Sequence, residues 1–157
     1  YPLPEAQLDR FMFNIWVDYP SFNEEMEIVR STTTNKKVQV NPVISGEEIV
    51  FYQQLIRKMP VTDNVIEYAV KLVSKTRPGG ENAPEMINQF LSWGAGPRAS
   101  QNLVVAAKCH AALNGKYSPD IEDIKAVAVP ILRHRIVRNY KAEAEGYTVE
   151  RIVDSIL

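Results

Sequence analysis

The sequence predicts a mainly α-helical bundle preceded by one short strand. Apolar residues recur at helical spacing through most of the chain after residue 45, and several of these stretches start with residues that cap helices. Only residues 11–17 have the composition of a strand buried on both faces, and a second candidate around residues 37–40 is short and half polar. We therefore expect five or six helices, at most two short strands and no sheet for residues 11–17 to join.

Two capping boxes predict where the first helices begin. Ser21 with Glu24 precedes a short apolar stretch. Ser45 with Glu48 precedes a longer amphipathic stretch, which Pro60 ends. In both pairs the serine side chain accepts a hydrogen bond from the helix backbone, and the glutamate returns one to the serine backbone.

Two further helices follow from apolar spacing and turn residues. One begins at Thr62 or Asp63 and ends before the Pro-Gly-Gly of residues 78–80, after which residues 79–84 are expected to form an exposed loop. Another runs from about Pro97 to Leu113, and an Asn-Gly pair ends it.

The last part of the chain predicts one long and one short helix. Ser118 and Pro119 predict the start of the long helix, because a capping hydroxyl there precedes a proline in the first turn. Pro130 lies inside this helix and predicts a kink or a break near Ala126. Residues 148–157 form the short amphipathic helix.

Composition bounds the class of protein. A chain of 157 residues with 45% hydrophobic and 24% charged residues suits one globular domain. A net charge of -1 argues against broad nucleic-acid binding, and no apolar run approaches the roughly 18 residues of a membrane span. The single cysteine, Cys109, cannot form an internal disulfide, so we expect a reducing, cytoplasmic location. The start at Tyr1, followed by turn residues, suggests a piece of a longer protein.

Arg98 stands at the predicted start of a helix, directly after Gly-Ala-Gly-Pro. It either solvates the helix surface or binds an anion. Helix N-termini favour anions, and a guanidinium grips phosphate oxygens at two points, so the position suits a bound phosphate. Gly94 and Gly96 would let the backbone turn sharply before the helix.

Arg10 follows Asp9 at the end of a short helical turn that opens after Pro4. One interpretation is an Asp-Arg pair on the surface, which contributes little. The other is a guanidinium held at the tip of the turn and aimed at another molecule. The segment alone leaves both open.

Other side chains offer weaker candidates. His110 lies on an apolar helix face and is expected to be a core histidine with a local partner. His134, between two arginines, belongs either to a basic helix end or to a subunit contact. With two histidines and one cysteine at no ligand spacing, we expect no metal site, and Cys109 is interpreted as packing.

Four stretches resemble the MoxR family of AAA+ ATPases. The first, YPLPEAQLDRF, is similar to the segment that carries the arginine finger, and GAGPRASQNLVVAAK is similar to the sensor 2 motif. The segments NVIEYAVKLVSKTR and VPILRHRI resemble the same family's helical lid, in the same order. The resemblance covers nearly the whole chain.

The resemblance implies two roles for arginine. Arg10 would act in trans as the arginine finger of a neighbouring subunit's site, and Arg98 would act in cis on the γ-phosphate of its own subunit's ATP. It further implies bound ATP and Mg²⁺, a homo-oligomeric ring that is a hexamer, and partners with von Willebrand factor A domains. The family's activity would be chaperone-like remodelling or metal-cofactor insertion.

The chain departs from the family in one respect. It has no G-x-x-x-x-G-K-[ST] and no apolar strand that ends in Asp-Glu, so the phosphate loop and the magnesium site are expected upstream. We therefore expect a C-terminal fragment that does not hydrolyse ATP by itself: residues 1–20 from the α/β core, 21–44 a linker and 45–157 the lid. Without the parent sheet, the strand at 11–17 should be disordered, packed on the bundle in a makeshift way, or paired with another copy.

Two alternatives remain from the residues. The chain could be an independent helical protein-interaction module without nucleotide chemistry. It could also bind nucleic acid through a basic stripe formed by Arg133, Arg135, Arg138 and Lys141.

Overall fold

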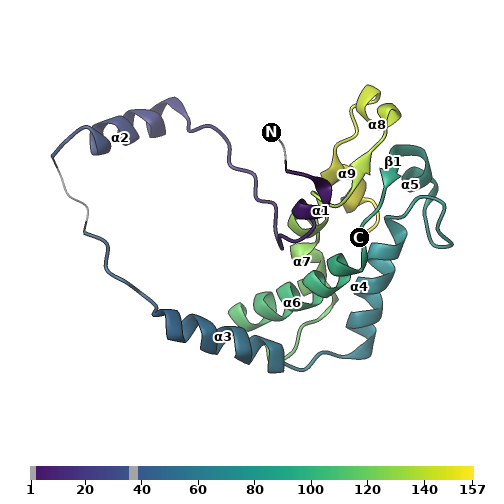
Figure 1. Cartoon of the computed structure of the whole chain (residues 1–157), viewed down its shortest axis with the longest axis horizontal. Coiled ribbons are helices and arrows are strands. Elements are labelled where there is room, and N and C mark those ends of the chain that lie inside the picture. Colours follow the sequence, from purple (N-terminus) through teal and green to yellow (C-terminus); the bar gives the residue numbers. More distant parts are fainter. Residues whose placement is uncertain (1–2, 36–38) are drawn as a thin grey trace.

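The computed structural model describes residues 3–35 and 39–157, and these ranges are mainly helical, as the sequence predicts (Figure 1). The long helices are α2 (Phe22–Thr32), α3 (Gly46–Lys58), α4 (Asp63–Lys75), α6 (Pro97–Leu113) and α7 (Ile121–Leu132). The short elements are α1 (Glu5–Leu8), α5 (Glu85–Phe90), β1 (Leu91–Trp93), β2 (Val137–Arg138), α8 (Tyr140–Ala144) and α9 (Val149–Asp154). Part of the strand candidate at 37–40 lies outside the described residues.

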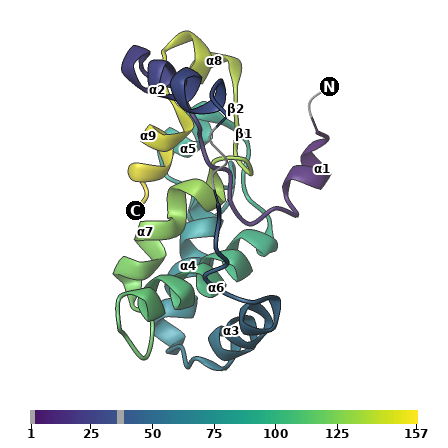
Figure 2. The ribbon, with the colours of Figure 1, turned by 90° about the vertical axis from the view of Figure 1, so that its left-hand side faces the viewer.

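The core forms where α6 packs against α7 and α4. The face of α6 that meets them carries small residues, including Ala99, Ala107 and Ala111, which are fully buried and let the helices approach closely. Leucine and isoleucine side chains from the neighbouring helices fill the space between them. The helix α9 covers α7, and α3 lies against α6 (Figures 1 and 2).

A small sheet closes one end of this bundle. The strands β1 and β2 are antiparallel, with Leu91 opposite Arg138, and the Asn139 N–H donates to the Phe90 carbonyl oxygen at 2.9 Å. The Phe90 ring stacks on Tyr147 with 4.2 Å between centroids. The helices α5 and α8 flank the sheet, and neither is evident from apolar spacing because each is too short to show a period.

Helix starts test the capping predictions. Both serine-glutamate capping boxes form, at Ser21 and at Ser45. The predicted start of α7 at Ser118-Pro119 is wrong, since the side chain of Asp120 caps the helix and accepts from the Asp123 N–H at 3.2 Å. The sequence also predicts a kink or a break near Ala126, and no break occurs there, because α7 is continuous through Pro130 in its last turn.

Residues 11–17 do not form the predicted strand. A strand buried on both faces needs pairing neighbours, and the described residues supply none. The segment instead packs on α7 in a makeshift way: the Asn14 N–H donates to the Pro130 carbonyl oxygen at 2.9 Å, and the Trp16 ring lies 5.5 Å from the Arg133 guanidinium. Ile15, Trp16 and Val17 stay exposed. Beyond them α2, within the expected linker, is exposed along its whole length and stands away from the bundle (Figure 1).

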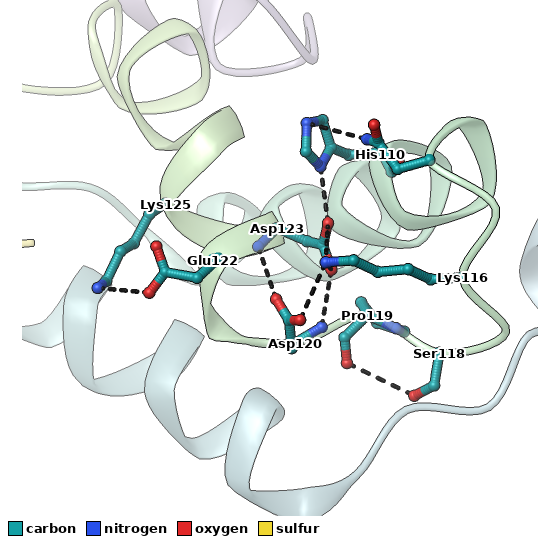
Figure 3. A network of polar contacts seen from close by, with 9 residues as sticks. His110, Lys116, Ser118, Pro119, Asp120, Glu122, Asp123 and Lys125 are labelled. Carbon is teal, nitrogen blue, oxygen red and sulfur yellow. Dashed lines mark hydrogen bonds and ion pairs between the residues drawn. The ribbon is translucent and has the colours of Figure 1, made fainter.

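A polar network joins the end of α6 to the start of α7 (Figure 3). The buried carboxylate of Asp123 lies 2.7 Å from His110 Nδ1, accepts from the Asp120 N–H at 2.9 Å and lies 3.1 Å from Lys116 Nζ. Burial alone would raise the pKa of Asp123, but these hydrogen bonds outweigh it and lower the pKa to about 2. His110 therefore has the local partner that the sequence predicts, although its side chain is 40% exposed.

Asp123 should make the unfolding free energy depend on pH in the acid range. Its pKa is below the ordinary value of 3.8, so the unfolded chain binds the proton more tightly and stability falls as the pH drops from about 4 towards 2. The shift corresponds to about 2 kcal/mol of unfolding free energy. Denaturant titrations between pH 6 and pH 2 should show this loss in the wild type and a flatter profile in Asp123→Asn. Glu122→Gln, which removes an exposed carboxylate, should keep the wild-type slope; equal slopes for wild type and Asp123→Asn would contradict the assignment.

Candidate functional site

The loop that leads into α6 is held by the end of α4. The Ala95 N–H donates to the buried Thr76 Oγ1 at 2.9 Å, and Arg77 Nε donates to the Ala95 carbonyl oxygen at 2.9 Å. Gly94 passes so close to α4 that a Cβ there would lie 2.2 Å from the Thr76 carbonyl oxygen. Glycine is therefore required at position 94, because the two backbones approach closely. This contact fixes where α6 begins and so where Arg98 lies.

The N-terminus of α6 is open. Gly96 is its N-cap residue, with φ of −82°, so no side chain caps the first turn and the glycine needs no unusual φ. Pro97 occupies the first turn, where its missing N–H is not needed. Helix N-termini carry a partial positive charge, so this end with Arg98 beside it can receive an anion.

Arg98 already has a carboxylate partner. Its Nη1 donates to Asp9 Oδ2 at 2.5 Å, between α6 and the residue that ends α1. The two side chains are 46% and 33% exposed. A pair this exposed contributes about 1 kcal/mol at most, so another anion can displace Asp9 at small cost.

Arg135 is the buried counterpart of Arg98. Its side chain is 1% exposed, and its Nε donates to Asp9 Oδ1 at 3.0 Å. The guanidinium also donates to the carbonyl oxygens of Asp9 at 2.8 Å, Phe11 at 2.5 Å and Met12 at 3.3 Å, and to that of Ile131. Burial lowers the pKa of Arg135, and the bond to Asp9 opposes this effect. Arg135 thus ties the N-terminal segment to the helical bundle.

Asp9 therefore joins two cations that are distant in sequence and different in burial. The surface pair between Asp9 and Arg10 that one interpretation suggested is replaced by the pairs to Arg98 and Arg135. Arg10 itself is exposed, and no hydrogen bond or ion pair holds its side chain within residues 3–35 and 39–157. Asp9 thus links Arg98 to the segment that carries Arg10, and the Arg10 side chain itself is exposed.

A cavity of about 260 Å³ adjoins this cluster, between α1, the loop before α6 and the segment after α7. Glu5, Trp93 and His134 help to line it. His134 Nε2 lies 3.0 Å from the Phe11 carbonyl oxygen, and burial lowers the pKa of this histidine despite that bond. His134 is thus part of the contact with the N-terminal segment rather than a basic helix end.

The basic stripe of the nucleic-acid alternative does not form. Arg135 is buried, and Arg133 Nε lies 2.9 Å from Glu150 Oε1. Arg138 donates to a backbone carbonyl oxygen at 2.7 Å, so its charge is also directed inward. Only Lys141 of the four has its side chain nearly half exposed.

Three further features of the described part of the chain concern metal binding, the cysteine and membrane insertion. No group of three or more histidine, cysteine, aspartate or glutamate side chains gathers there to hold a metal ion. Cys109 is half-buried in the middle of α6, and burial raises the pKa of its thiol, the opposite of what activates a nucleophilic cysteine. None of the described helices is both long and apolar enough to cross a bilayer.

Sequence reasoning placed Arg135 in a basic surface stripe and missed its role as a buried anchor. It stands in an arginine-rich run after α7, within the segment VPILRHRI that resembles the lid, and neither feature indicates burial. Arg135 is buried only when residues 9–12, which are more than a hundred positions away, pack against it.

Comparison with known proteins extends these observations. A family model described as the AAA lid domain matches residues 84–156, the part from α5 to α9 that contains Arg98 and Arg135. The whole chain is 35% identical to Uncharacterized protein YeaC of Bacillus subtilis (strain 168) and spans 47% of its length. It is 32% identical to Chaperone MoxR1 of Mycobacterium tuberculosis (strain ATCC 25618 / H37Rv) and spans 41% of its length.

A solved structure has a similar fold. The crystal structure of a "putative ATPase" from Cytophaga hutchinsonii ATCC 33406 matches 99% of this chain with a TM-score of 0.87 and 38% identity. The match covers 48% of that protein, so the chain spans less than half of each of these relatives. The likeness includes the N-terminal segment and α2 as well as the lid.

The contact between Gly94 and α4 should be intolerant of any side chain. Gly94→Ala places a methyl group against the Thr76 carbonyl and should lower the unfolding free energy by about 2 kcal/mol or more. Gly96→Ala is the matched control, because a Cβ there meets no atom within 4 Å. It should lower the unfolding free energy by only about 1 kcal/mol, since alanine is a poor N-cap residue. Equal losses in the two variants, measured by denaturant unfolding, would contradict the close approach.

The tether formed by Arg135 should protect the exposed Arg10 from trypsin. Arg135→Met keeps the apolar volume but removes the bonds to residues 9–12, so the N-terminal segment should detach more often. Cleavage after Arg10 should then be about tenfold faster, since proteolysis follows the population of the open form. Lys141→Met removes an exposed cation and should leave the rate unchanged. A rate for Arg135→Met equal to that of the wild type would exclude a tether.

Proposed function

We propose that this chain contains the lid region of a MoxR-like AAA+ ATPase, and that Arg98 and Arg10 complete two different nucleotide sites of an ATP-hydrolysing ring. Arg98 serves the site of its own subunit as the sensor 2 residue. Arg10 serves the site of the next subunit as the arginine finger. The observation that carries the proposal is that Asp9, the chain neighbour of Arg10, binds Arg98 at an open helix N-terminus, while Arg10 itself is exposed and free of ion pairs in the described chain.

The surroundings of Arg98 suit a terminal phosphate. The N-terminus of α6 adds partial positive charge, and Gly96 leaves space for an approaching anion because nothing lies within 4 Å of its would-be Cβ. The guanidinium is half-exposed and held only by an exchangeable partner, so it can reach a ligand without unfolding its helix. Arg98 would hold the γ-phosphate and sense the difference between ATP and ADP.

The surroundings of Arg10 suit a group that acts on another subunit. Its side chain is exposed, while its backbone lies beside the bonds that Arg135 makes to Asp9 and Phe11. A cation on an anchored backbone can enter a neighbouring site in a defined direction. In phosphoryl transfer, such an arginine stabilises the charge that develops on the transferred phosphate, by about 10³ to 10⁵ in rate.

The other half of the site is expected outside this chain. ATP with Mg²⁺ supplies the scissile phosphoanhydride, and the described residues include neither a metal-binding cluster nor a phosphate loop. The relatives extend over more than twice the length matched here, which leaves room for a nucleotide-binding core. In the proposed protein, this chain contributes the lid and the finger, and it does not hydrolyse ATP by itself.

We further propose the assembly and its use. The trans role of Arg10 requires a homo-oligomeric ring, which we take to be a hexamer, and its activity is chaperone-like remodelling of a client or insertion of a metal cofactor. A cytoplasmic location and a partner with a von Willebrand factor A domain complete the proposal. Support comes from the relative named as a chaperone and from the resemblance of the motifs.

Substitutions of the two arginines should have different effects on ATP turnover and on ATP affinity. In the full-length protein that carries this chain, Arg10→Ala should lower ATP turnover by about 10³-fold with ATP affinity retained, because a finger acts mainly in the transition state. Arg98→Ala should lower turnover and also weaken ATP relative to ADP. Arg30→Ala, an exposed arginine on α2, is the control and should keep wild-type kinetics.

A mixing experiment tests the trans role. Arg10→Ala subunits keep an intact nucleotide site, and subunits whose own phosphate loop is inactivated keep the finger. Mixed rings should regain turnover that neither variant shows alone. Mixed rings without any recovery would contradict action in trans, and full activity of Arg10→Ala alone would contradict the finger.

A further inference from the structure

Asp9 is held unequally by its two partners. The bond from Arg135 is buried, with 1% of that side chain exposed, and it is one of several that fasten the same segment. The bond from Arg98 is at the surface, with 46% of the side chain exposed. Of the two contacts, the one to Arg98 is the one that can be exchanged.

The exchangeable partner is a carboxylate, placed where the proposed ligand is a phosphate. Arg98 Nη1 lies 2.5 Å from Asp9 Oδ2, so this N–H cannot serve an incoming phosphate in the same geometry. A terminal phosphate offers more charge and more acceptor oxygens than one carboxylate oxygen, and the helix N-terminus favours it as well. Phosphate and carboxylate are therefore competitors for one guanidinium.

We propose that Asp9 is a positioning residue that holds Arg98 until the terminal phosphate of a nucleoside triphosphate replaces it, and that this exchange resets the adjacent Arg10. The inference rests on the proposed function and goes beyond it, because it assigns Asp9 a role in selecting triphosphate over diphosphate and in linking one site to the next.

The burial of Arg135 makes the exchange feasible. When Arg98 leaves, Asp9 keeps its bond to Arg135 Nε at 3.0 Å and is not left as an unpaired charge. Arg10 follows Asp9 by one peptide bond, so a change in the partners of Asp9 reaches the finger directly. One exposed ion pair thereby connects the ligand of one subunit to the side chain that enters the next.

The test compares nucleotide preference in Asp9→Asn and wild type, using the full-length protein. The measurement is the ratio of dissociation constants for ADP and a non-hydrolysable ATP analogue, by calorimetry. The amide oxygen can still accept from Arg135, but the charge that competes for Arg98 is gone. The preference for the ATP analogue should rise roughly fivefold, the size of an exposed ion pair, with ADP affinity unchanged. Asp9→Ser, which also keeps an acceptor, replaces Asp9→Asn if that variant does not fold.

A double-mutant cycle makes the result specific. In an Arg98→Ala background, Asp9→Asn should no longer change the ADP-to-analogue ratio. Glu25→Gln removes an exposed carboxylate on α2, away from Arg98, and should leave the ratio at the wild-type value. The kcat of Asp9→Asn should fall while the ATP analogue binds more tightly, because Arg10 loses its positioning neighbour.

Each outcome decides between the two proposals. An unchanged ratio in Asp9→Asn, or the same change with Arg98 absent, would overturn the exchange, and an unchanged kcat would overturn the link to Arg10. Neither result would affect the role of Arg98 if Arg98→Ala by itself abolishes the preference for triphosphate. If Arg98→Ala keeps that preference, the proposed function itself fails.

Discussion

The buried guanidinium of Arg135 is the interaction on which the described arrangement depends. Removing an arginine from water is unfavourable by several kcal/mol unless its donors are satisfied, and here a carboxylate and the carbonyl oxygens of Asp9, Phe11, Met12 and Ile131 satisfy them. Because three of these carbonyls belong to residues 9–12, the satisfaction of Arg135 requires that segment to lie on the lid. The position of Asp9, and through it the contact with Arg98, follows from that requirement.

A second constraint holds Arg98 from the opposite side. Gly94 lies against the backbone of Thr76, and the Thr76 hydroxyl accepts from the Ala95 N–H, so the start of α6 is fixed to the end of α4. Arg98 is thus placed by backbone packing. Arg10 is placed by the buried ion pair between Arg135 and Asp9, so both arginines are held to the same helical bundle. In the proposed ring, a movement of the lid would move Arg98 and Arg10 together, which would couple closure over one nucleotide to completion of the next site.

Local sequence signals predicted most long helices and failed where longer-range contacts decide. The Ser21 and Ser45 capping boxes form because all their partners lie within three residues. Asp120, not Ser118, caps α7. The Asp120 N–H also donates to the Asp123 carboxylate, and His110 and Lys116 bind the same carboxylate. The strand expected at residues 11–17 has strand composition but no pairing neighbour among the described residues, and composition cannot supply one.

The sequence by itself determined the helical periodicity, most of the helix starts, and the two arginines as candidates, because these depend on residues close together in the chain. The family resemblance, too, is carried by short motifs. Only the tertiary structure decided the partners of Asp9, which are 89 and 126 positions away, and the burial of Arg135. The free energy of an ionic group depends on what surrounds it after folding, so the same residue type is exposed at Arg10, exchangeable at Arg98 and buried at Arg135.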